Sequence, residues 1–362
     1  MVLFTPFAET LHTGIEKSEA RSPAGYMTQK SMKRQTVCTI FTVLIGIFLL
    51  ALVLSLGLSV FRQSRRSGSE MPDQDVLPSS QTDLPGLPAA PEITDDQPEP
   101  AESPSNTQGS FFSIHFFDVG EGDSALVECE GHYMLIDGGS PECSSFLYAY
   151  LEQHEIPYLD CIVCSHAHAD HVGGLSGALN YATVGTAYCS VTEYDSRAFR
   201  SFVKYLGEQN VGITVPSPGD TFSLGDATVT FLGPVDMSLA DENENNSSII
   251  LRIDYGATSF LFTGDAEREE ELSVVESGQN LHCTLLRVAH HGSYTSSSEE
   301  FLSAADPEYA VISVGGDNEY GHPHDSALDR LNGICDSLYR TDLNGEIISY
   351  SDGTHLSFET RR

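Results

Sequence analysis

The chain has 362 residues, of which 52 are Asp or Glu and 18 are Lys or Arg, and its formal net charge is -34. This acidity argues against a protein that binds nucleic acid through a broad basic surface, because neutralising phosphates requires clustered Lys and Arg. The chain has no glycine period and no sustained heptads, and its 8 cysteines are too few for a disulfide scaffold, so collagen-like, coiled-coil and disulfide-rich classes are excluded.

Three zones are expected before a globular domain. Residues 1–36 form a polar N-terminal segment, within which Met32 is an alternative start. Residues 37–61 are apolar and carry no charged side chain; as a helix they would extend roughly 37 Å, which predicts a single transmembrane helix. Residues 62–109 interleave prolines with Ser, Asp, Glu and Gln, which predicts a disordered linker. Basic residues flank both ends of the span, and their slight excess before it favours an extracytoplasmic position for the remainder.

Residues 110–362 are expected to form one α/β domain, which holds 10 Lys and Arg against 40 Asp and Glu. Its two β-rich halves, with helices between them, favour a layered sandwich over a single parallel sheet. Strands are predicted at 112–119, 125–130, 132–136, 158–164, 228–232, 249–255, 258–262, 282–288 and 309–314, followed by a closing hairpin. Helices are predicted at 144–154, 196–209, 267–276, 299–304 and 326–334.

The strongest chemical signal is the segment His166-Ala-His168-Ala-Asp170-His171, which ends an apolar strand and precedes two glycines. His166 and His168 alternate, so in extended chain they point to the same side and can bind one divalent ion through imidazole nitrogens. Asp170 and His171 follow where the chain turns and can face a neighbouring ion. A polar surface turn is the alternative interpretation.

This motif resembles the signature of the metallo-β-lactamase fold, and further motifs follow the same order as in the C-terminal hydrolase domain of the ComEC family of competence proteins. These motifs are Phe117-Asp-Val-Gly-Glu-Gly-Asp123, Leu135-Ile-Asp-Gly-Gly139, Phe262-Thr-Gly-Asp265, Val288-Ala-His-His-Gly-Ser293 and Tyr320-Gly-His-Pro-His324. The resemblance spans almost all of residues 112–350. It implies a four-layer αβ/βα sandwich with a dinuclear metal site on one edge.

The resemblance also implies a ligand set for two divalent metal ions, Zn²⁺ or Mn²⁺. His166 and His168 would bind the first metal, whereas Asp170 and His171 would bind the second. Asp265, at the end of a predicted strand, would bridge both. Two ions held in this way can activate a water and stabilise charge on an oxyanion.

The remaining ligand of the second metal is expected to be His291, in a His-Gly turn. His290 is the alternative ligand and would otherwise contact substrate. Asp170, Asp265 and His322 are expected to be the catalytic residues. For His322, with its neighbour His324, the predicted role is phosphate contact or proton donation to the leaving group, and a solvated turn is the alternative.

The sequence departs from the family pattern at the first metal. The fold usually supplies another His before the bridging Asp, but no His occurs between His171 and His282. Glu244, Asn245 or Asn246 is expected to substitute. Oxygen ligands suit harder ions, so this site would be weaker or would favour Mn²⁺ over Zn²⁺.

Carboxylates and cysteines elsewhere suggest supporting roles. Asp118, Asp123 and Asp137 lie in glycine-containing turns and are expected to orient the metal-binding histidines, with a purely structural role as the alternative. Cys161 and Cys164 lie on a strand and should point to opposite faces as buried thiols rather than a redox pair.

Four glutamates at positions 267, 269, 270 and 271 are expected to form a solvated first turn of a helix.

The sequence thus predicts a membrane-anchored metal-dependent hydrolase with an extracytoplasmic domain. The resemblance favours hydrolysis of phosphodiesters, with DNA as substrate during DNA uptake or processing. The negative charge of the domain would repel a polyanion unless the metals and residues such as Arg287 and Arg340 create a local positive patch. The first alternative is a surface phosphodiesterase that acts on teichoic-acid phosphorylcholine or another small ester. The second is a non-catalytic metal-binding module. No nucleotide cofactor is expected.

Overall fold

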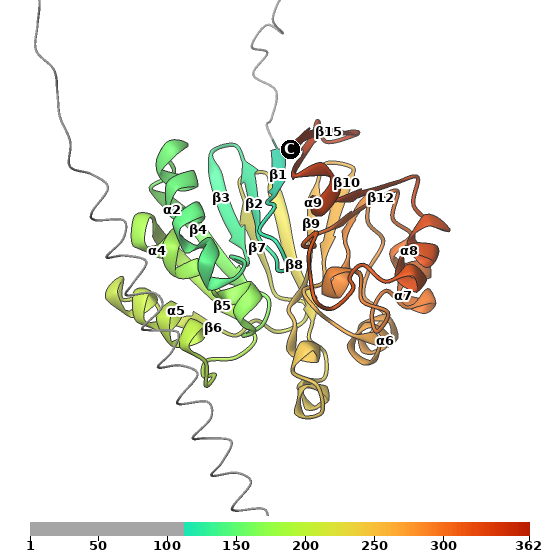
Figure 1. Cartoon of the computed structure of the whole chain (residues 1–362), viewed down its shortest axis with the longest axis horizontal. Helices are drawn as coiled ribbons and strands as arrows, with labels where there is room; N and C mark the ends of the chain where they lie inside the picture. The colour runs from blue at the N-terminus through green and yellow to red at the C-terminus, as the bar shows by residue number, and fades with distance from the viewer. Residues whose placement is uncertain (1–111) are drawn as a thin grey trace, which may run out of the picture. The chain divides into compact units, whose positions relative to one another are not determined.

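Two β-sheets lie face to face in the computed structural model, which describes residues 112–362 (Figure 1). The predicted N-terminal segment (1–36), membrane span (37–61) and linker (62–109) lie outside the described residues. Within 112–362, none of the helices has the length and apolar character needed to cross a membrane.

The first sheet contains eight of the described strands, in the order β15-β14-β1-β2-β3-β4-β5-β6. Antiparallel pairing joins β15 through β3, and parallel pairing joins β3 through β6. The strands are β1 (Phe112–Phe116), β2 (Ala125–Cys129), β3 (His132–Ile136), β4 (Tyr158–Cys164), β5 (Thr183–Cys189), β6 (Ile213–Thr214), β14 (Glu346–Ser351) and β15 (Leu356–Arg361).

The second sheet contains seven of the described strands, in the order β13-β12-β11-β10-β9-β8-β7. Strands β10 to β13 pair in parallel, whereas β7 to β10 pair antiparallel. Their bounds are β7 (Thr221–Leu224), β8 (Ala227–Gly233), β9 (Ile250–Tyr255), β10 (Thr258–Phe262), β11 (Leu285–Arg287), β12 (Tyr309–Ile312) and β13 (Ser337–Arg340).

Helices cover the outer face of each sheet, so the layers run helix, sheet, sheet, helix (Figure 1). Helices α2 (Ser144–Gln153), α4 (Leu175–Tyr181) and α5 (Arg197–Glu208) lie on the first sheet, and α6 (Arg268–Glu276), α7 (Glu299–Ala305) and α8 (Asp325–Asn332) on the second. Short helices α3 (Ala169–Val172) and α9 (Thr341–Asn344) complete the set, with 3₁₀ turns η1 (Pro141–Cys143), η2 (Met237–Asp241), η3 (Glu244–Ser247) and η4 (Ala289–Gly292).

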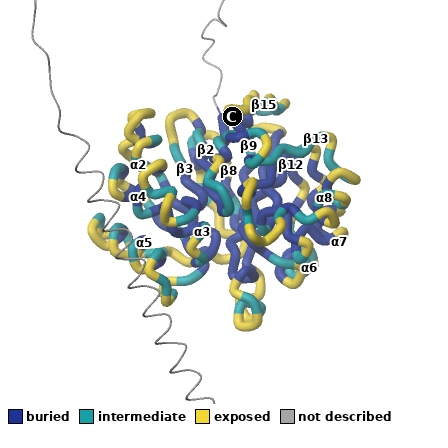
Figure 2. The backbone as a smooth tube through the Cα atoms, viewed as in Figure 1, coloured by how far each residue is buried: buried dark blue, intermediate teal, exposed yellow. Residues whose placement is uncertain are grey.

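Three apolar clusters hold these layers together, and they form the buried interior in Figure 2. The central cluster lies between the sheets, where Phe112 of β1 stacks on Tyr255 and Phe260 with ring centroids 4.8 Å apart. The other two clusters lie between each sheet and its helices. The mixed α/β fold with two sheets that the sequence predicts is therefore confirmed.

Strand β4 is buried on both faces, as expected for a parallel strand inside a layered fold. Cys161 belongs to the central cluster and Cys164 to the outer one. Both thiols are buried and free, which confirms the prediction made from their alternation. Burial raises the pKa of both thiols, so neither favours the reactive thiolate.

Several elements were not predicted from the sequence, above all helix α4 and strands β5, β7 and β13. A glycine, Gly177, lies inside α4 and weakens its helical signal. It is required because a Cβ at this position would lie 1.9 Å from the carbonyl oxygen of Ser144 in α2. Strand β1 ends at Phe116 and not at residue 119, because the chain turns at Gly120 and Gly122, both with positive φ.

Three of the four glutamates near the start of α6 are not solvated, so that prediction is wrong for them. The side chain of Glu267 is only 13% exposed. Glu270 and Glu271 are fully buried. Glu271 accepts hydrogen bonds from the backbone N–H groups of Ser297 (2.6 Å) and Ser298 (2.8 Å), which precede α7. Glu270 accepts one from Val235 N at 2.7 Å. These carboxylates accept hydrogen bonds from backbone segments outside α6. The local sequence of α6 therefore does not reveal that they are buried.

Candidate metal centre

The predicted metal ligands lie on loops that follow β4, β10 and β11. Strand β4 ends at Cys164, and the chain bends at His166 and Ala167 before His168, which precedes the single turn α3. Asp265 follows β10, and η4 follows β11 with His290 and His291. Segments far apart in the sequence therefore bring their polar side chains together at one edge of the two sheets.

Helix α3 is held against the turn between β1 and β2. Asp123 N donates to the carbonyl oxygen of Asp170 at 3.1 Å. A Cβ at Gly122 would lie 2.4 Å from that same oxygen, so the close approach requires glycine. The glycines of the first motif therefore fix the position of the helix that carries Asp170 and His171.

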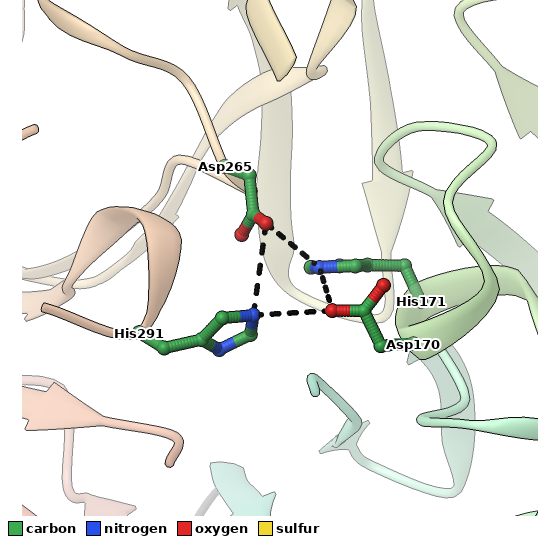
Figure 3. Close-up of side chains that lie close together, drawn as sticks. All are labelled: Asp170, His171, Asp265 and His291. Carbon is green, nitrogen blue, oxygen red and sulfur yellow. Dashed lines mark ion pairs between the residues drawn. The ribbon is translucent and has the colours of Figure 1, made fainter. Parts of the chain in front are cut away.

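Four side chains converge on a single point: Asp170, His171, Asp265 and His291 (Figure 3). Their candidate ligand atoms all lie within 4.8 Å of one another. Asp265 Oδ2 is 3.2 Å from His171 Nε2 and 3.6 Å from His291 Nε2. Asp170 Oδ2 is 3.7 Å and 3.4 Å from the same two nitrogens. These are the residues that the resemblance assigns to the second metal.

The inward nitrogens of this cluster are suited to bind a cation. The Nε2 atoms of His166, His171 and His291 and the Oδ1 of Asp265 are buried without a hydrogen-bond partner among the described residues. The other ring nitrogen is held in each case, for example by Ser313 O, which lies 2.9 Å from His291 Nδ1. Buried polar atoms without partners are costly, and a divalent ion bound to imidazole and carboxylate satisfies them.

Asp137 orients His171 from behind. Its Oδ2 is 2.9 Å from His171 Nδ1, and its two oxygens also accept hydrogen bonds from the backbone and hydroxyl of Ser165, both at 2.7 Å. Asp123 lies further from His171, at 3.7 Å, and pairs closely with Arg287. Asp118 is exposed and accepts from Gly120 N in its own turn. Of the three carboxylates, Asp137 therefore makes the direct contact.

Burial and the neighbouring carboxylates act in opposite directions on the imidazoles of the cluster. Burial disfavours a charged His171, yet the carboxylate of Asp265 holds the pKa of this imidazole well above its usual value. Burial is likewise outweighed at His291, where Asp265 raises the pKa to about 9. Burial keeps the pKa of His166 well below its usual value, so this residue is neutral, the form that binds metals.

Only some of the residues predicted for the first metal lie close to Asp265. His166 Nε2 lies 3.9 Å from Asp265 Oδ2. His168 is at the rim, where its Nε2 is 3.1 Å from Glu244 Oε2. Asn245 lines the pocket, and its Oδ1 is buried without a partner within residues 112–362. Asn246 Oδ1 instead accepts from Glu267 N, so Glu244 and Asn245 are the better placed substitutes for the missing His.

A pocket of about 230 Å³ opens over the cluster. Its lining residues are Glu121, His168, Asp170, Asn245, Asp265, His290, His291, Tyr320 and His322. His290 Nε2 is 4.0 Å from Asp265 Oδ2. The ring of His322 lies 5.5 Å from that of His290, and Tyr320 stacks on His322. The structure thus places His322 beside the cluster, whereas His324 lies behind it and accepts from Tyr294 N.

The expected positive patch is not found at the pocket within residues 112–362. Arg287 is buried, donates to the carbonyl oxygen of Gly264 at 2.6 Å and pairs with Asp123. Arg340 pairs with Asp342. Among the described residues that line the pocket, none is Lys or Arg. The prediction for Arg287 and Arg340 is therefore wrong, because both guanidinium groups are taken up by internal carboxylates.

Sequence reasoning missed two carboxylates at this site. Glu121 Oε1 is 2.7 Å from His322 Nδ1, and Glu267 Oε1 is 3.4 Å from His290 Nδ1. Hydrogen bonds from His290 and Asn245 outweigh burial and lower the pKa of Glu267 to about 2. In the sequence, the feature that could have indicated a role for Glu121 was its position between two glycines. For Glu267 it was the position two residues after Asp265.

The chain is similar in sequence to a family of known proteins. The sequence profile of the Metallo-beta-lactamase superfamily matches residues 117–316. The chain is 30% identical over 252 residues to ComE operon protein 3 of Bacillus subtilis (strain 168), and 32% identical over 237 residues to Competence protein ComA of Neisseria gonorrhoeae. Each match covers 65% of this chain and 32% of the relative, so the chain spans about one third of the length of these ComEC family proteins.

A solved structure, the metallo-beta-lactamase fold protein YhfI from Bacillus subtilis, is similar with a TM-score of 0.42 and 14% identity. The match covers 68% of this chain and 100% of YhfI.

Proposed function

Since this chain belongs to the metallo-beta-lactamase superfamily and is a metal-dependent hydrolase related to the ComEC competence proteins, we propose that it hydrolyses phosphodiesters. DNA is the proposed substrate, in DNA uptake or processing. The observation that carries this proposal is the convergence of Asp170, His171, Asp265 and His291 beneath an open pocket.

The proposed ligand set follows from this convergence. Asp265 would help to hold both of two divalent ions, Zn²⁺ or Mn²⁺, and its central position 3.2–4.0 Å from four imidazole nitrogens supports that role. Asp170, His171 and His291 complete one site. His166 and His168 contribute to the other, with Glu244 or Asn245 in the place of the missing His. Oxygen ligands at this site, which is the first metal site of the sequence prediction, favour Mn²⁺.

Bound there, the ions supply a water of lowered pKa and stabilise negative charge on the phosphate. The protein's own side chains orient and complete this chemistry. Asp137 and Ser313 hold His171 and His291 with Nε2 directed inward. His322 donates a proton to the leaving oxygen, and its position on the pocket wall supports this role. His290 contacts a phosphate oxygen through its Nε2, because its Nδ1 is the nitrogen that lies near Glu267.

One observation favours a second candidate substrate. The pocket presents carboxylates and no Lys or Arg among its described lining residues, and a strongly acidic domain repels a polyanion. Tyr320 is 70% exposed at the pocket. Its ring can stack on a nucleobase of single-stranded DNA or bind a quaternary ammonium group. A phosphorylcholine ester on a teichoic acid is therefore the second candidate.

We also propose a membrane anchor at residues 37–61, with the hydrolase domain on the extracytoplasmic side. The apolar character and length of this segment support the proposal. The test is the fractionation of cells followed by external protease. A chain that stays with the membrane and is digested from outside supports it, and a chain recovered in the cytosol contradicts it.

The decisive experiment uses the full chain, purified without chelator. Bound metal is quantified, and hydrolysis of bis-p-nitrophenyl phosphate, linear single-stranded DNA and a phosphorylcholine ester is measured with Zn²⁺ and with Mn²⁺. Asp265→Asn, which retains shape and removes charge, is the control. We expect turnover with Mn²⁺ that the control lacks, and the ratio of the three rates identifies the substrate.

Two outcomes contradict the proposal. Protein that holds two ions but leaves all three substrates intact is not a phosphodiesterase. Protein that holds one ion or none, again without turnover, favours the non-catalytic binding module, whose metal site the missing His would have weakened.

A further inference from the structure

Two side chains from distant parts of the sequence meet on one wall of the pocket. Glu121 lies in the turn between β1 and β2, and His322 lies in the loop between β12 and α8. The Oε1 atom of Glu121 is 2.7 Å from Nδ1 of His322, across 201 positions of sequence. The side chains are only 16% and 6% exposed. A close contact with so little solvent around it restricts both groups strongly.

Glu121 is itself held in place by the loop it contacts. Its second oxygen accepts a hydrogen bond from Gly315 N at 3.0 Å. Asn318 then closes the loop: its Oδ1 accepts from His322 N at 2.9 Å, and its Nδ2 donates to the carbonyl oxygens of His322 and Gly315, both at 2.7 Å. One carboxylate therefore joins the start of the loop to His322 at its end.

The chemistry of the pair fixes which nitrogen of His322 is free. An ionised carboxylate only accepts hydrogen bonds, so Nδ1 must carry a proton to contact it. With Nδ1 engaged, Nε2 is the nitrogen left for the pocket that His322 lines. A carboxylate that holds one imidazole nitrogen so that the other can exchange protons with substrate is a well-established arrangement in hydrolases.

We propose that Glu121 is the positioning residue for His322, fixing its ring orientation and tautomer so that Nε2 acts on the leaving group. This inference rests on the proposed hydrolysis. In that reaction the donor is the imidazolium form of His322, which carries a proton on each nitrogen. Its Nε2 proton passes to the leaving oxygen as the bond from that oxygen to phosphorus breaks, and the neutral imidazole that remains keeps its Nδ1 proton against Glu121. The attacking water supplies the oxygen that replaces the leaving group and the proton that restores Nε2.

The first test reads the tautomer directly, without metal and without turnover. The full chain is labelled with ¹⁵N-histidine, and the His322 signals are assigned by their loss in His322→Ala. At a pH where the ring is neutral, we expect the Nδ1–H form in the wild type and in Glu319→Gln, an exposed residue of the same loop. In Glu121→Ala the Nε2–H form should appear. A wild type already in the Nε2–H form, or one unchanged by Glu121→Ala, overturns the proposal.

The second test separates proton donation from mere support of the loop. p-Nitrophenolate leaves as a stable anion, whereas the alkoxide released from DNA needs a proton. Glu121→Gln should therefore lower kcat on DNA about 100-fold with KM within about twofold, and should leave bis-p-nitrophenyl phosphate nearly unaffected. Glu319→Gln should match the wild type on both substrates.

Equal losses on the two substrates would mean that Glu121 only supports the pocket, and the proposal would fail. If the wild type hydrolyses neither substrate, the proposed function fails instead, and the tautomer measurement alone then decides the positioning role of Glu121.

Discussion

Asp137 Oδ2 lies 2.9 Å from His171 Nδ1, and this contact aims His171 Nε2 at Asp265 Oδ2, which is 3.2 Å away. The three side chains come from loops after β3, β4 and β10. Asp137 is held in turn by Ser165, the residue directly before His166. The loop that carries the histidine motif is thus fixed by a carboxylate from the neighbouring strand.

Asp137→Asn should weaken metal binding by about 10–100-fold, the usual effect of losing a carboxylate that orients a metal-binding histidine. The amide retains the shape of the side chain but can offer its nitrogen to His171 Nδ1, which favours the wrong tautomer. Competition titration with a metal indicator measures the affinity. Asp118→Asn, in an exposed turn, is the matched control, and equal affinities for the two variants would refute the orienting role.

Mn²⁺ should raise the melting temperature of the protein, because an ion that binds the folded state stabilises it. At a free concentration 1,000 times Kd the gain is about 4 kcal/mol, or about 8–16 °C for a domain of this size. Asp265→Asn should lose most of this response. The measurement is thermal unfolding with and without chelator, and a response retained in Asp265→Asn would show that the ion binds elsewhere.

Glu271→Ala should destabilise the protein by about 3 kcal/mol. The substitution leaves the backbone N–H groups of Ser297 and Ser298 buried without an acceptor, and each such loss costs about 1–3 kcal/mol. Chemical denaturation measures the free energy of unfolding. Glu269→Ala, two residues earlier on the exposed face of α6, should change stability by less than about 0.5 kcal/mol. Similar values for the two variants would contradict the burial of Glu271.

Glu270 should make stability depend on pH. Burial raises the pKa of this carboxyl to about 7 in the folded protein, so the folded state binds the proton more tightly than the unfolded chain does. Its contribution is therefore fully present below about pH 4.5 and is lost as the pH rises to about 7. Glu270→Gln cannot ionise, and its stability relative to the wild type should rise across this range.

The measurement for Glu270 is the difference in melting temperature between variant and wild type at several pH values. The two pKa values imply a change of roughly 2–3 kcal/mol between pH 5 and pH 8, which corresponds to an increase of about 4–12 °C. Glu269→Gln should give a flat difference. A flat difference for Glu270→Gln as well would mean that the carboxyl is ionised throughout the range.

Local patterns in the sequence predicted much of the fold and the core of the site. The alternation in β4 indicated its two buried faces, but the same-side direction expected for the two histidines after it holds only in part, because His166 is buried and His168 lies at the rim. Asp265 and His291 came from the family resemblance, because nothing local marks a carboxylate or a His-Gly turn as a ligand. Elements with internal glycine, such as α4, escaped prediction because the close contact that requires the glycine is visible only in three dimensions.

Pairings across long sequence separations could not be predicted in this way. Glu121 and His322 are 201 residues apart, and the sequence around either residue does not indicate the other as its partner. Arg287 looked available for substrate because its partner, Asp123, comes from the opposite half of the fold. The burial of Glu270 and Glu271 likewise depends on backbone donors in other loops. In each case the deciding contact is a tertiary contact between distant segments, which the local sequence around either residue does not show.

The backbone at His290 and His291 has φ values of 50° and 53°, in the left-handed region that favours glycine. Gly292 continues the same sense with φ of 78°. Two histidines here hold a conformation that costs of order 1 kcal/mol or more each, and glycine would adopt it freely. Selection of variants for heat resistance in the presence of a chelator should therefore enrich glycine at positions 290 and 291, so a stability screen without metal and without a functional readout would remove the site while stabilising the rest of the domain.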